Sequence, residues 1–300
     1  MRIGHRPGVQ VFVTLAAGDT IAAMLTRRAF GMWTAGAASS LIAESRANLK
    51  IGVMDTVFRL GGNPQAVPLA RKLGLAAVQV TLGRSADGRT LPLEDSAAQQ
   101  RWIKASIDSG IPLDATYLDQ LHIDCLKNSA QAPMWVRKGI QITKNLNAKI
   151  LMTVFFGKCQ VLERKELDYA LDRFAEILPE AERAGIVIGF ENTSSGEDNR
   201  YAVDKLRSNF FKVWYDVGNS TYNHYDVPRE IRMLGRERIC QFHFKDRGYL
   251  GEGQVNFPAI LSAINDIGFT GYANLETGSP SGNVEADTGR NLAYLRRVMG

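Results

Sequence analysis

Four residues with metal-binding side chains each close a short apolar segment in the second half of the chain: Glu191, Asp216, His243 and Glu276. Their segments read IVIGFEN, KVWYDVGN, CQFHFKD and YANLET, and the intervals between the four residues are 25, 27 and 33 residues. Each interval fits one strand followed by one helix. A single charge at a strand end is usually only solvated, but four in successive units indicate a shared site.

Three carboxylates and one imidazole predict a divalent-metal site with open coordination positions. This oxygen-rich set favours Mn²⁺, with Mg²⁺, Co²⁺ and Zn²⁺ as alternatives, over a closed structural zinc site. Glu191 and Glu276 would come from the fifth and eighth strands, on opposite sides of a barrel mouth. We therefore expect one glutamate to remove a proton from a substrate carbon and the other to return one, while the metal stabilises an enediolate.

The elements that must position these residues alternate between β-like and helix-like from Asn48 onward. The pattern predicts strands at 49–54, 76–81, 112–117, 149–156, 186–191, 212–216, 239–244 and 271–276. Helices are predicted at 64–74, 95–110, 133–147 and 166–185, and then near 201–207, 228–235, 257–267 and 287–298. Eight strand-helix units without a linker predict an α/β fold, a single-domain (β/α)8 TIM barrel over residues 48–300.

A doubly wound open sheet is the architectural alternative. That fold normally carries a Gly-rich phosphate turn after its first strand, and VMDTVFRLGG does not match such a turn.

Motifs around the four residues resemble those of a known family, the xylose isomerase-like TIM barrels, often labelled sugar phosphate isomerase/epimerase. The motifs are GFEN at 189–192, YDVGN at 215–219, FHFKDR at 242–247, LGEGQVNFPAIL at 250–261 and NLET at 274–277. The resemblance covers about residues 49–298. It implies that Glu191, Asp216, His243 and Glu276 bind the metal and that the two glutamates perform the acid-base steps.

One position departs from the family's ketose 3-epimerases, which commonly have a substrate-binding His three residues after the metal-binding Asp. Here that position is Asn219. The endonuclease branch of the family needs a His-rich trinuclear zinc cluster. The four histidines of this chain, with His5 outside the barrel, argue against that branch.

Five polar residues near the expected mouth are candidates for substrate binding: Lys158, Asn219, Lys245, Asp246 and Arg247. Lys245 and Lys158 could each hold a substrate oxygen or be solvated loop charges. Arg247 begins a glycine-containing loop that could cover the pocket, although its glycines also suit ordinary turns. His122 and His224 are predicted to be surface or supporting histidines rather than ligands.

The three cysteines form no CxxC pair, so the sequence predicts neither a disulfide framework nor a thiolate zinc site. Cys159 follows the fourth predicted strand. We expect it to be a small buried apolar residue.

The N-terminal 47 residues are predicted to lie outside the barrel. Residues 26–31 read TRRAFG, an apolar small-residue run follows, and 45–47 read SRA. This arrangement predicts a twin-arginine signal peptide that is removed on export to the periplasm, and the sequence leaves the start open between Met1 and Met24. The alternative is a surface helix with a chance arginine pair in a cytoplasmic protein.

The net charge of the chain indicates which classes of partner it binds. Of 36 Lys and Arg and 31 Asp and Glu residues, five and two lie in the first 47, so the remainder carries a net charge of +2 rather than +5. That balance does not support nucleic-acid or membrane-surface binding. We expect a small-molecule sugar as partner, with a homo-oligomer possible in principle.

Three functional hypotheses remain open from the sequence. The first is a metal-dependent isomerase or epimerase of a free sugar or keto-sugar, because phosphosugars are mainly cytoplasmic and no Gly-rich anion cradle is evident. The second is a keto-sugar or inosose lyase or hydrolase on the same scaffold. The third is a non-catalytic sugar-binding barrel.

Overall fold

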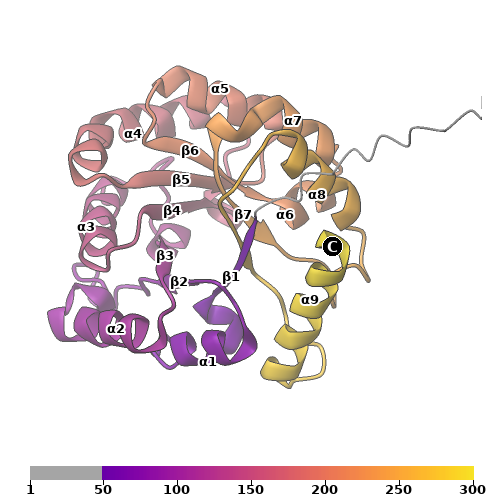
Figure 1. The fold of residues 1–300 in the computed structure, drawn as a ribbon. Coiled ribbons are helices and arrows are strands. Elements are labelled where there is room, and N and C mark those ends of the chain that lie inside the picture. The colour runs from indigo at the N-terminus through magenta and orange to yellow at the C-terminus, as the bar shows by residue number, and fades with distance from the viewer. Residues whose placement is uncertain (1–48) are drawn as a thin grey trace, which may run out of the picture. The chain divides into compact units, whose positions relative to one another are not determined.

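Eight parallel strands pair in chain order from β1 to β8, and β8 pairs back with β1, so the sheet closes into a barrel. The computed structural model describes residues 49–300, which contain every element named below. Figure 1 shows the strands inside a ring of helices. The predicted (β/α)8 barrel is confirmed. The open-sheet alternative is wrong, because the first and last strands pair with each other and leave no open edge.

The strands all lie close to their predicted positions. They are β1 (Lys50–Met54), β2 (Val78–Thr81), β3 (Leu113–Tyr117), β4 (Ile150–Phe155), β5 (Val187–Asn192), β6 (Phe211–Asp216), β7 (Ile239–Phe244) and β8 (Tyr272–Leu275). Glu276 lies just beyond the end of β8, and its backbone N–H still donates to the carbonyl of Phe244 on β7.

The helices follow the strands around the barrel. They are α1 (Ala66–Leu73), α2 (Ser96–Ser109), α3 (Ala132–Asn145), α4 (Arg164–Ala184), α5 (Gly196–Leu206), α6 (Val217–Tyr222), α7 (Val227–Arg238), α8 (Phe257–Asp266) and α9 (Val284–Met299). Four 3-10 turns complete the connections: η1 (Asp55–Phe58), η2 (Pro92–Glu94), η3 (Asp119–His122) and η4 (Gly157–Cys159).

Two helices differ from the prediction, and capping side chains explain both. Helix α5 begins earlier than expected because the Ser195 hydroxyl accepts from the backbone N–H of Asp198. The short helix α6 was not predicted. It begins directly after β6 because the Asp216 carboxylate accepts from the backbone N–H of Asn219 at 2.8 Å.

The outer faces of the strands pack on the helices through aromatic side chains. Phe155 on β4 contacts Phe190 on β5 with ring centroids 4.8 Å apart, and Phe174 on α4 contacts Phe211 on β6 at 4.9 Å. All four rings are buried. This packing explains why the β4 sequence is almost unbroken in its apolar character, since both of its faces are covered.

The inner faces carry polar residues that hydrogen-bond across the barrel. Gln241 on β7 donates to the Asp114 carboxylate on β3 at 2.5 Å, and Asn274 on β8 donates to the same carboxylate at 3.0 Å. Asp114 is buried, and burial raises its pKa to about 6 against the opposing effect of these hydrogen bonds. These three residues form a polar floor beneath the mouth of the barrel.

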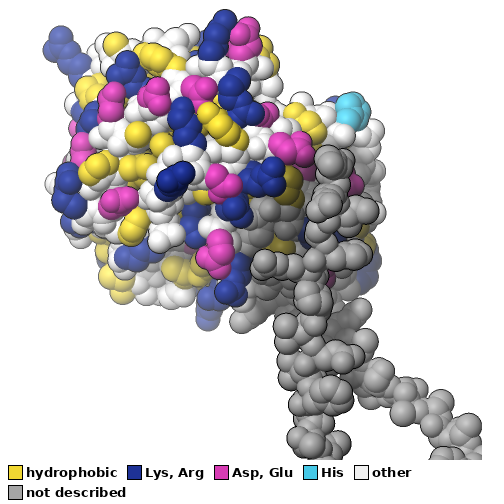
Figure 2. Space-filling view, turned by 90° about the horizontal axis from the view of Figure 1, so that it is seen from above, with side chains coloured by type: hydrophobic (Ala, Val, Ile, Leu, Met, Phe, Trp, Pro, Cys, Tyr) yellow, Lys and Arg dark blue, Asp and Glu magenta, His cyan; other side chains and the backbone are white. Residues whose placement is uncertain are grey.

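The predicted boundary at residue 48 and the twin-arginine segment lie outside the described residues. Among residues 49–300, none of the helices has the length and apolar character needed to cross a bilayer. Figure 2 shows Lys and Arg side chains interspersed with Asp and Glu over the face that it draws.

Candidate metal centre and active site

The structure brings together the four residues that the sequence singled out. Each stands at or just past the carboxyl end of its strand, β5 to β8, and one ligand atom from each lies within 4.8 Å of the others. Asp216 and His243 are direct register partners on neighbouring strands. Glu191, Asp216 and His243 are buried, while the Glu276 side chain is 33% exposed. The cluster therefore opens toward solvent on the β8 side.

His243 lies at the centre of the cluster. Its Nδ1 is 2.7 Å from Glu191 Oε1 and 3.2 Å from Glu276 Oε2. Its Nε2 is 2.8 Å from Oε1 of Gln79 on β2, whose own amide nitrogen contacts the Met152 sulfur at 3.2 Å. A carbonyl oxygen only accepts hydrogen bonds, so Nε2 carries the proton.

The donor atoms of the four side chains suit a divalent cation. With one proton fixed on Nε2, His243 shares its other proton between Nδ1 and the glutamates, and loss of that proton would leave Nδ1 as the nitrogen that metal ligation requires. Three carboxylates and an imidazole nitrogen are donors that suit Mn²⁺, Mg²⁺, Co²⁺ or Zn²⁺. The donor set and its orientation are therefore present in the chain itself.

Lys245, two residues after His243, pairs with the carboxylates from the mouth side. Its ammonium is 2.7 Å from Asp216 Oδ2 and 2.9 Å from Glu276 Oε2. Gly218 permits this approach, because a Cβ at that position would lie 2.5 Å from Lys245 Cγ. The glycine of the YDVGN motif thus makes room for the lysine that neutralises part of the cluster.

The charges in the cluster shift each other's pKa. Burial alone would lower the pKa of His243, but the negative charges of Glu191 and Glu276 outweigh burial and raise it to about 10. Burial raises the pKa of Asp216 to about 7 despite the Lys245 ammonium. Burial also opposes ionisation of Glu276, yet Lys245 and His243 hold its pKa below the usual range. A protonated His243 and Lys245 thus supply positive charge among the carboxylates.

The other predicted substrate-binding residues occupy different surroundings. Asp246 accepts from the Tyr222 hydroxyl at 2.5 Å and from several backbone N–H groups between residues 247 and 254, so it organises that loop. The Arg247 guanidinium lies over the Tyr222 ring at 4.3 Å and is exposed. Lys158 is exposed on η4 at the end of β4. Their role in binding a substrate stays a prediction.

Asn219, the departure from the 3-epimerase pattern, lies next to the cluster. Its backbone N–H donates to Asp216 Oδ1, while its side-chain Nδ2 is buried without a hydrogen-bond partner among the described residues. A buried donor without a partner is costly. The side-chain amide of Asn219 is therefore a hydrogen-bond donor that is not used within the described residues.

Cys159 is buried as predicted, but the expectation that it is an unpaired apolar residue is wrong, because the structure joins it to Cys125 in a disulfide with Cα atoms 4.9 Å apart. Cys125 follows η3 at the end of β3, and Cys159 ends η4 at the end of β4. The loops of neighbouring strands meet at the mouth, which spacing in the sequence did not reveal. Cys240 is the cysteine that remains free.

Gln79 was not identified from the sequence as a partner of the cluster, Tyr117 was assigned no role in the site, and His122 was assigned only a surface or supporting one. Gln79 is a polar residue in the middle of an apolar strand, and that exception was a usable signal for an inward-facing partner. Tyr117 ends β3, and its hydroxyl is 2.7 Å from Nε2 of His122. Nothing in the local sequence indicates this last contact.

Comparisons with known proteins agree with the barrel fold. The family model described as xylose isomerase-like TIM barrel matches residues 67–298. A protein of Escherichia coli (strain K12) named "Putative L-ribulose-5-phosphate 3-epimerase SgbU" is 24% identical over 243 residues, which cover 71% of this chain and 82% of that protein.

Solved structures share the fold at low sequence identity. A D-psicose 3-epimerase determined in the presence of D-fructose has a TM-score of 0.71 and 17% identity, covering 84% of this chain and all of that chain. The IolI protein with a bound zinc atom has a TM-score of 0.68 and 15% identity, covering 84% of this chain and 98% of that one.

Proposed function

Since the chain belongs to the xylose isomerase-like TIM barrel family, we propose that it is a divalent-metal-dependent isomerase or epimerase of a free sugar or keto-sugar. The observation that carries the proposal is the cluster of Glu191, Asp216, His243 and Glu276, with His243 oriented by Gln79. Relatives and neighbours named as sugar epimerases support the same reaction class.

The four residues would hold the metal, which would polarise adjacent hydroxyl and carbonyl oxygens of the sugar and so acidify the carbon between them. Mn²⁺ suits this oxygen-rich set best, and the zinc in IolI supports the possibility of another divalent ion. Lys245 lies beside Asp216 and Glu276, where it can bind a substrate oxygen in exchange for one carboxylate.

The two glutamates have different surroundings that suit different roles. Glu191 is buried and its Oε1 is bonded to His243, whereas the Glu276 side chain is one-third exposed and has two cationic neighbours. Glu276 is therefore held ionised and ready to accept a proton from carbon. The two glutamates do not lie on opposite sides of the mouth as predicted, because both contact His243 Nδ1. A protonated Glu191 can give its proton to that carbon while Glu276 keeps the proton that it removed, so the two carboxyl groups exchange protonation states in one turnover.

Export of the mature chain is part of the proposal. The twin-arginine pattern at 26–31 supports it, and so does the disulfide between Cys125 and Cys159, because disulfides persist in oxidising compartments such as the periplasm. A periplasmic location favours a free sugar over a phosphorylated one.

A metal titration combined with product analysis tests the proposed function. The protein, stripped with a chelator and reloaded with Mn²⁺, is incubated in D₂O with D-fructose, D-allulose, D-tagatose and L-ribulose. We expect stoichiometric Mn²⁺ binding, a new ketose or aldose by chromatography, and deuterium at the reacting carbon.

The outcomes of this experiment distinguish the proposed reaction from its alternatives. Deuterium incorporation identifies proton transfer by a protein base, because an isomerase that moves hydride directly would leave the carbon unlabelled. Binding of these sugars without turnover would replace the proposal with a sugar-binding barrel. Failure to bind a divalent cation would refute it.

A further inference from the structure

A second cluster of polar side chains lies at the mouth, at the end of β3 and in the segments that follow β2 and β3, rather than at β5 to β8. Its members are Arg84, Tyr117, Asp119 and His122. Arg84 forms two hydrogen bonds to the Asp119 carboxylate, at 2.7 and 3.1 Å. The Tyr117 hydroxyl donates to Asp119 at 2.9 Å and lies 2.7 Å from His122 Nε2. The four side chains thus form one continuous chain of hydrogen bonds.

Tyr117 connects this cluster to the proposed metal centre. It is the register partner of Met152 on β4, and the Met152 sulfur contacts Gln79, the residue that orients His243. Partners in a parallel pair point to the same side, so Tyr117 rises from the inner face. The pKa of Tyr117 is raised by burial first, then by Asp119, and also by the charges of Glu191 and Glu276. The cluster is thus within electrostatic reach of the metal centre.

The hydrogen-bond chain determines which nitrogen of His122 carries a proton. A carboxylate only accepts, so the single Tyr117 hydroxyl proton goes to Asp119. The hydroxyl oxygen then accepts from His122, which places the proton on Nε2. Burial lowers the pKa of His122, with Asp119 opposing the shift, so the ring is neutral near pH 7. Its Nδ1 is then an acceptor, and no hydrogen bond within residues 49–300 uses that atom.

The surroundings hold the His122 ring in place. The ring stacks on Phe156, at the end of β4, with centroids 5.9 Å apart. The disulfide joins the loop that follows His122 to η4, and the Cys159 sulfur lies 3.4 Å from the His122 carbonyl oxygen. The side chain nevertheless remains 27% exposed. An aromatic ring that is fixed but not covered can receive a ligand.

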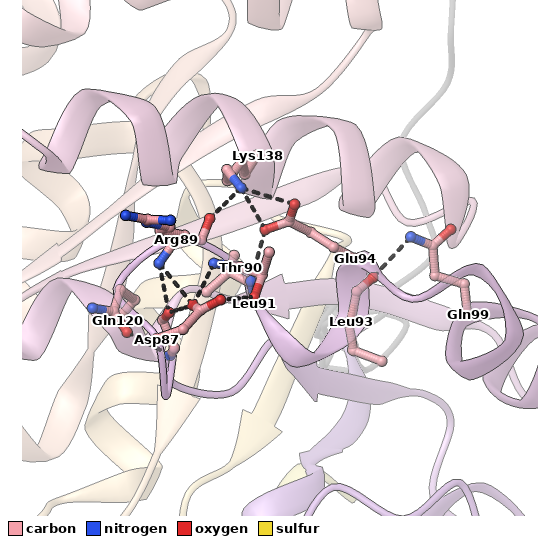
Figure 3. Close-up of polar contacts among 10 residues, drawn as sticks. Asp87, Arg89, Thr90, Leu91, Leu93, Glu94, Gln99, Gln120 and Lys138 are labelled. Carbon is pink, nitrogen blue, oxygen red and sulfur yellow. Dashed lines mark hydrogen bonds and ion pairs between the residues drawn. The ribbon is translucent and has the colours of Figure 1, made fainter.

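The loop that carries Arg84 is also held firmly (Figure 3). Asp87 accepts from the backbone N–H groups of Arg89 and Thr90, and Lys138 on α3 binds Glu94 and the Arg89 carbonyl. The Ser85 N–H donates to Gln120, the residue after Asp119. The β2 loop therefore supports Asp119 through both Arg84 and Gln120.

We propose that Nδ1 of His122 accepts a hydrogen bond from a sugar hydroxyl beyond the oxygens that face the metal centre, and that Tyr117 and Asp119 position the ring. The inference rests on the proposed function and adds a specificity determinant to it. Because Asp119 balances the charge of Arg84 and the His122 ring is itself neutral, Nδ1 presents a neutral acceptor. It suits a neutral polyhydroxylated sugar rather than a phosphate ester.

Two near-isosteric substitutions separate the roles of the two ring nitrogens. His122→Gln keeps a donor where Nε2 bonds Tyr117 but removes the acceptor at Nδ1, whereas His122→Asn keeps an acceptor near Nδ1 and loses the bond to Tyr117. A neutral hydrogen bond is worth about 3- to 10-fold in binding, so we expect His122→Gln to raise KM by that factor with kcat within about twofold. His122→Asn should raise KM less. His224→Gln, at an exposed histidine, is the matched control and should leave KM unchanged.

A purely structural role predicts the reverse order, with His122→Asn impaired and His122→Gln like the wild type. That order, or two variants like the wild type, would overturn the inference. Kinetics are measured on whichever of D-fructose, D-allulose, D-tagatose and L-ribulose the Mn²⁺-loaded protein converts.

A measurement without substrate keeps this inference separate from the proposed function. Long-range ¹H–¹⁵N NMR of the full chain at pH 7 should show His122 neutral with its proton on Nε2, and Tyr117→Phe should weaken that preference. A proton on Nδ1, or a charged ring, would overturn the inference even if turnover is present. Absence of both Mn²⁺ binding and turnover would overturn the proposed function, and with it the assignment of a sugar to His122.

Discussion

The side chains on the two sides of the barrel mouth are held in place by different kinds of interaction. Between β5 and β8, three carboxylates, an imidazole and an ammonium are crowded together, and their charges shift one another's pKa. Between β2 and β4, the charges of Arg84 and Asp119 cancel, and hydrogen bonds from Tyr117 to Asp119 and from His122 to Tyr117 fix the two rings. Concentrated charge suits bond-making and proton transfer, while a fixed neutral surface suits recognition. Substitutions on the first side should therefore act on kcat or metal binding, and those on the second on KM.

The two sides also differ in how their loops are held. A disulfide joins the loops after β3 and β4, whereas the loop after β7 is held by hydrogen bonds to the Asp246 carboxylate. The recognition side is therefore covalently fixed. The loop after β7 has no covalent cross-link and is held by non-covalent contacts alone, including the ion pair of Glu252 with Arg290.

The largest effect should follow removal of the proton acceptor on the charged side. Glu276→Gln keeps the shape of the side chain but cannot take a proton from carbon, so we expect kcat to fall about 10²- to 10⁴-fold. Steady-state kinetics with saturating Mn²⁺ measure this, and Glu237→Gln, an exposed change on α7, is the control. A rise in KM with normal kcat would contradict the division between the two sides.

Loss of the disulfide should be the next largest effect, and it should fall on the recognition side. Replacing Cys125 and Cys159 by Ser removes a cross-link across 34 residues of sequence, which costs about 4 kcal/mol of stability. Urea unfolding measures the loss. We also expect a higher KM, because the loop that carries His122 is released, with Mn²⁺ affinity unchanged.

Dithiothreitol provides the matching test on the unmodified chain. It should destabilise the wild type and a Cys240→Ala variant equally, since Cys240 is the free cysteine. If the double variant instead lost Mn²⁺ binding and kept KM, the disulfide would belong to the charged side of the mouth.

The contrast between the sides explains what could be predicted from the sequence. Each of the four candidate metal ligands lies at or next to the carboxyl end of its own strand, so apolar runs closed by Glu191, Asp216 or His243 were enough to place them. The pairing of Cys125 with Cys159 and the contact of His122 with Tyr117 depend on which loops meet above neighbouring strands. Those loops have no periodicity. Gln79 acts from across the barrel, at a distance in sequence that no local pattern spans.

Gln79 tests whether the charged side depends on the opposite wall of the barrel. Gln79→Leu removes the acceptor that keeps the His243 proton on Nε2, and loss of such a partner typically weakens metal binding about 10- to 100-fold. Calorimetric titration with Mn²⁺ measures the change. Gln99→Leu, a buried glutamine on α2 that bonds the Leu93 carbonyl, is the control. Equal Mn²⁺ affinity in both variants would show that His243 needs no partner from β2.

The smallest effect concerns the floor, where the two sides meet. Asp114 belongs to β3, but its hydrogen-bond donors are on β7 and β8. Burial raises its pKa to about 6, above the ordinary value of about 4 for an unfolded chain. The folded protein therefore holds this proton more tightly than the unfolded chain does. Its stabilising effect is complete below pH 4 and is lost as the pH rises through 6.

Asp114→Asn removes this titration, so the free energy of unfolding of the wild type relative to the variant should fall by on the order of 2 kcal/mol between pH 4 and pH 7.5. Urea unfolding of both proteins without metal measures the difference, in which the titrations of His243 and Asp216 largely cancel. Asp108→Asn, at an exposed residue of α2, should leave no such slope. A flat difference for Asp114→Asn would mean that the β3 carboxylate is as well solvated in the barrel as in water. The floor would then not couple the two sides through a buried charge.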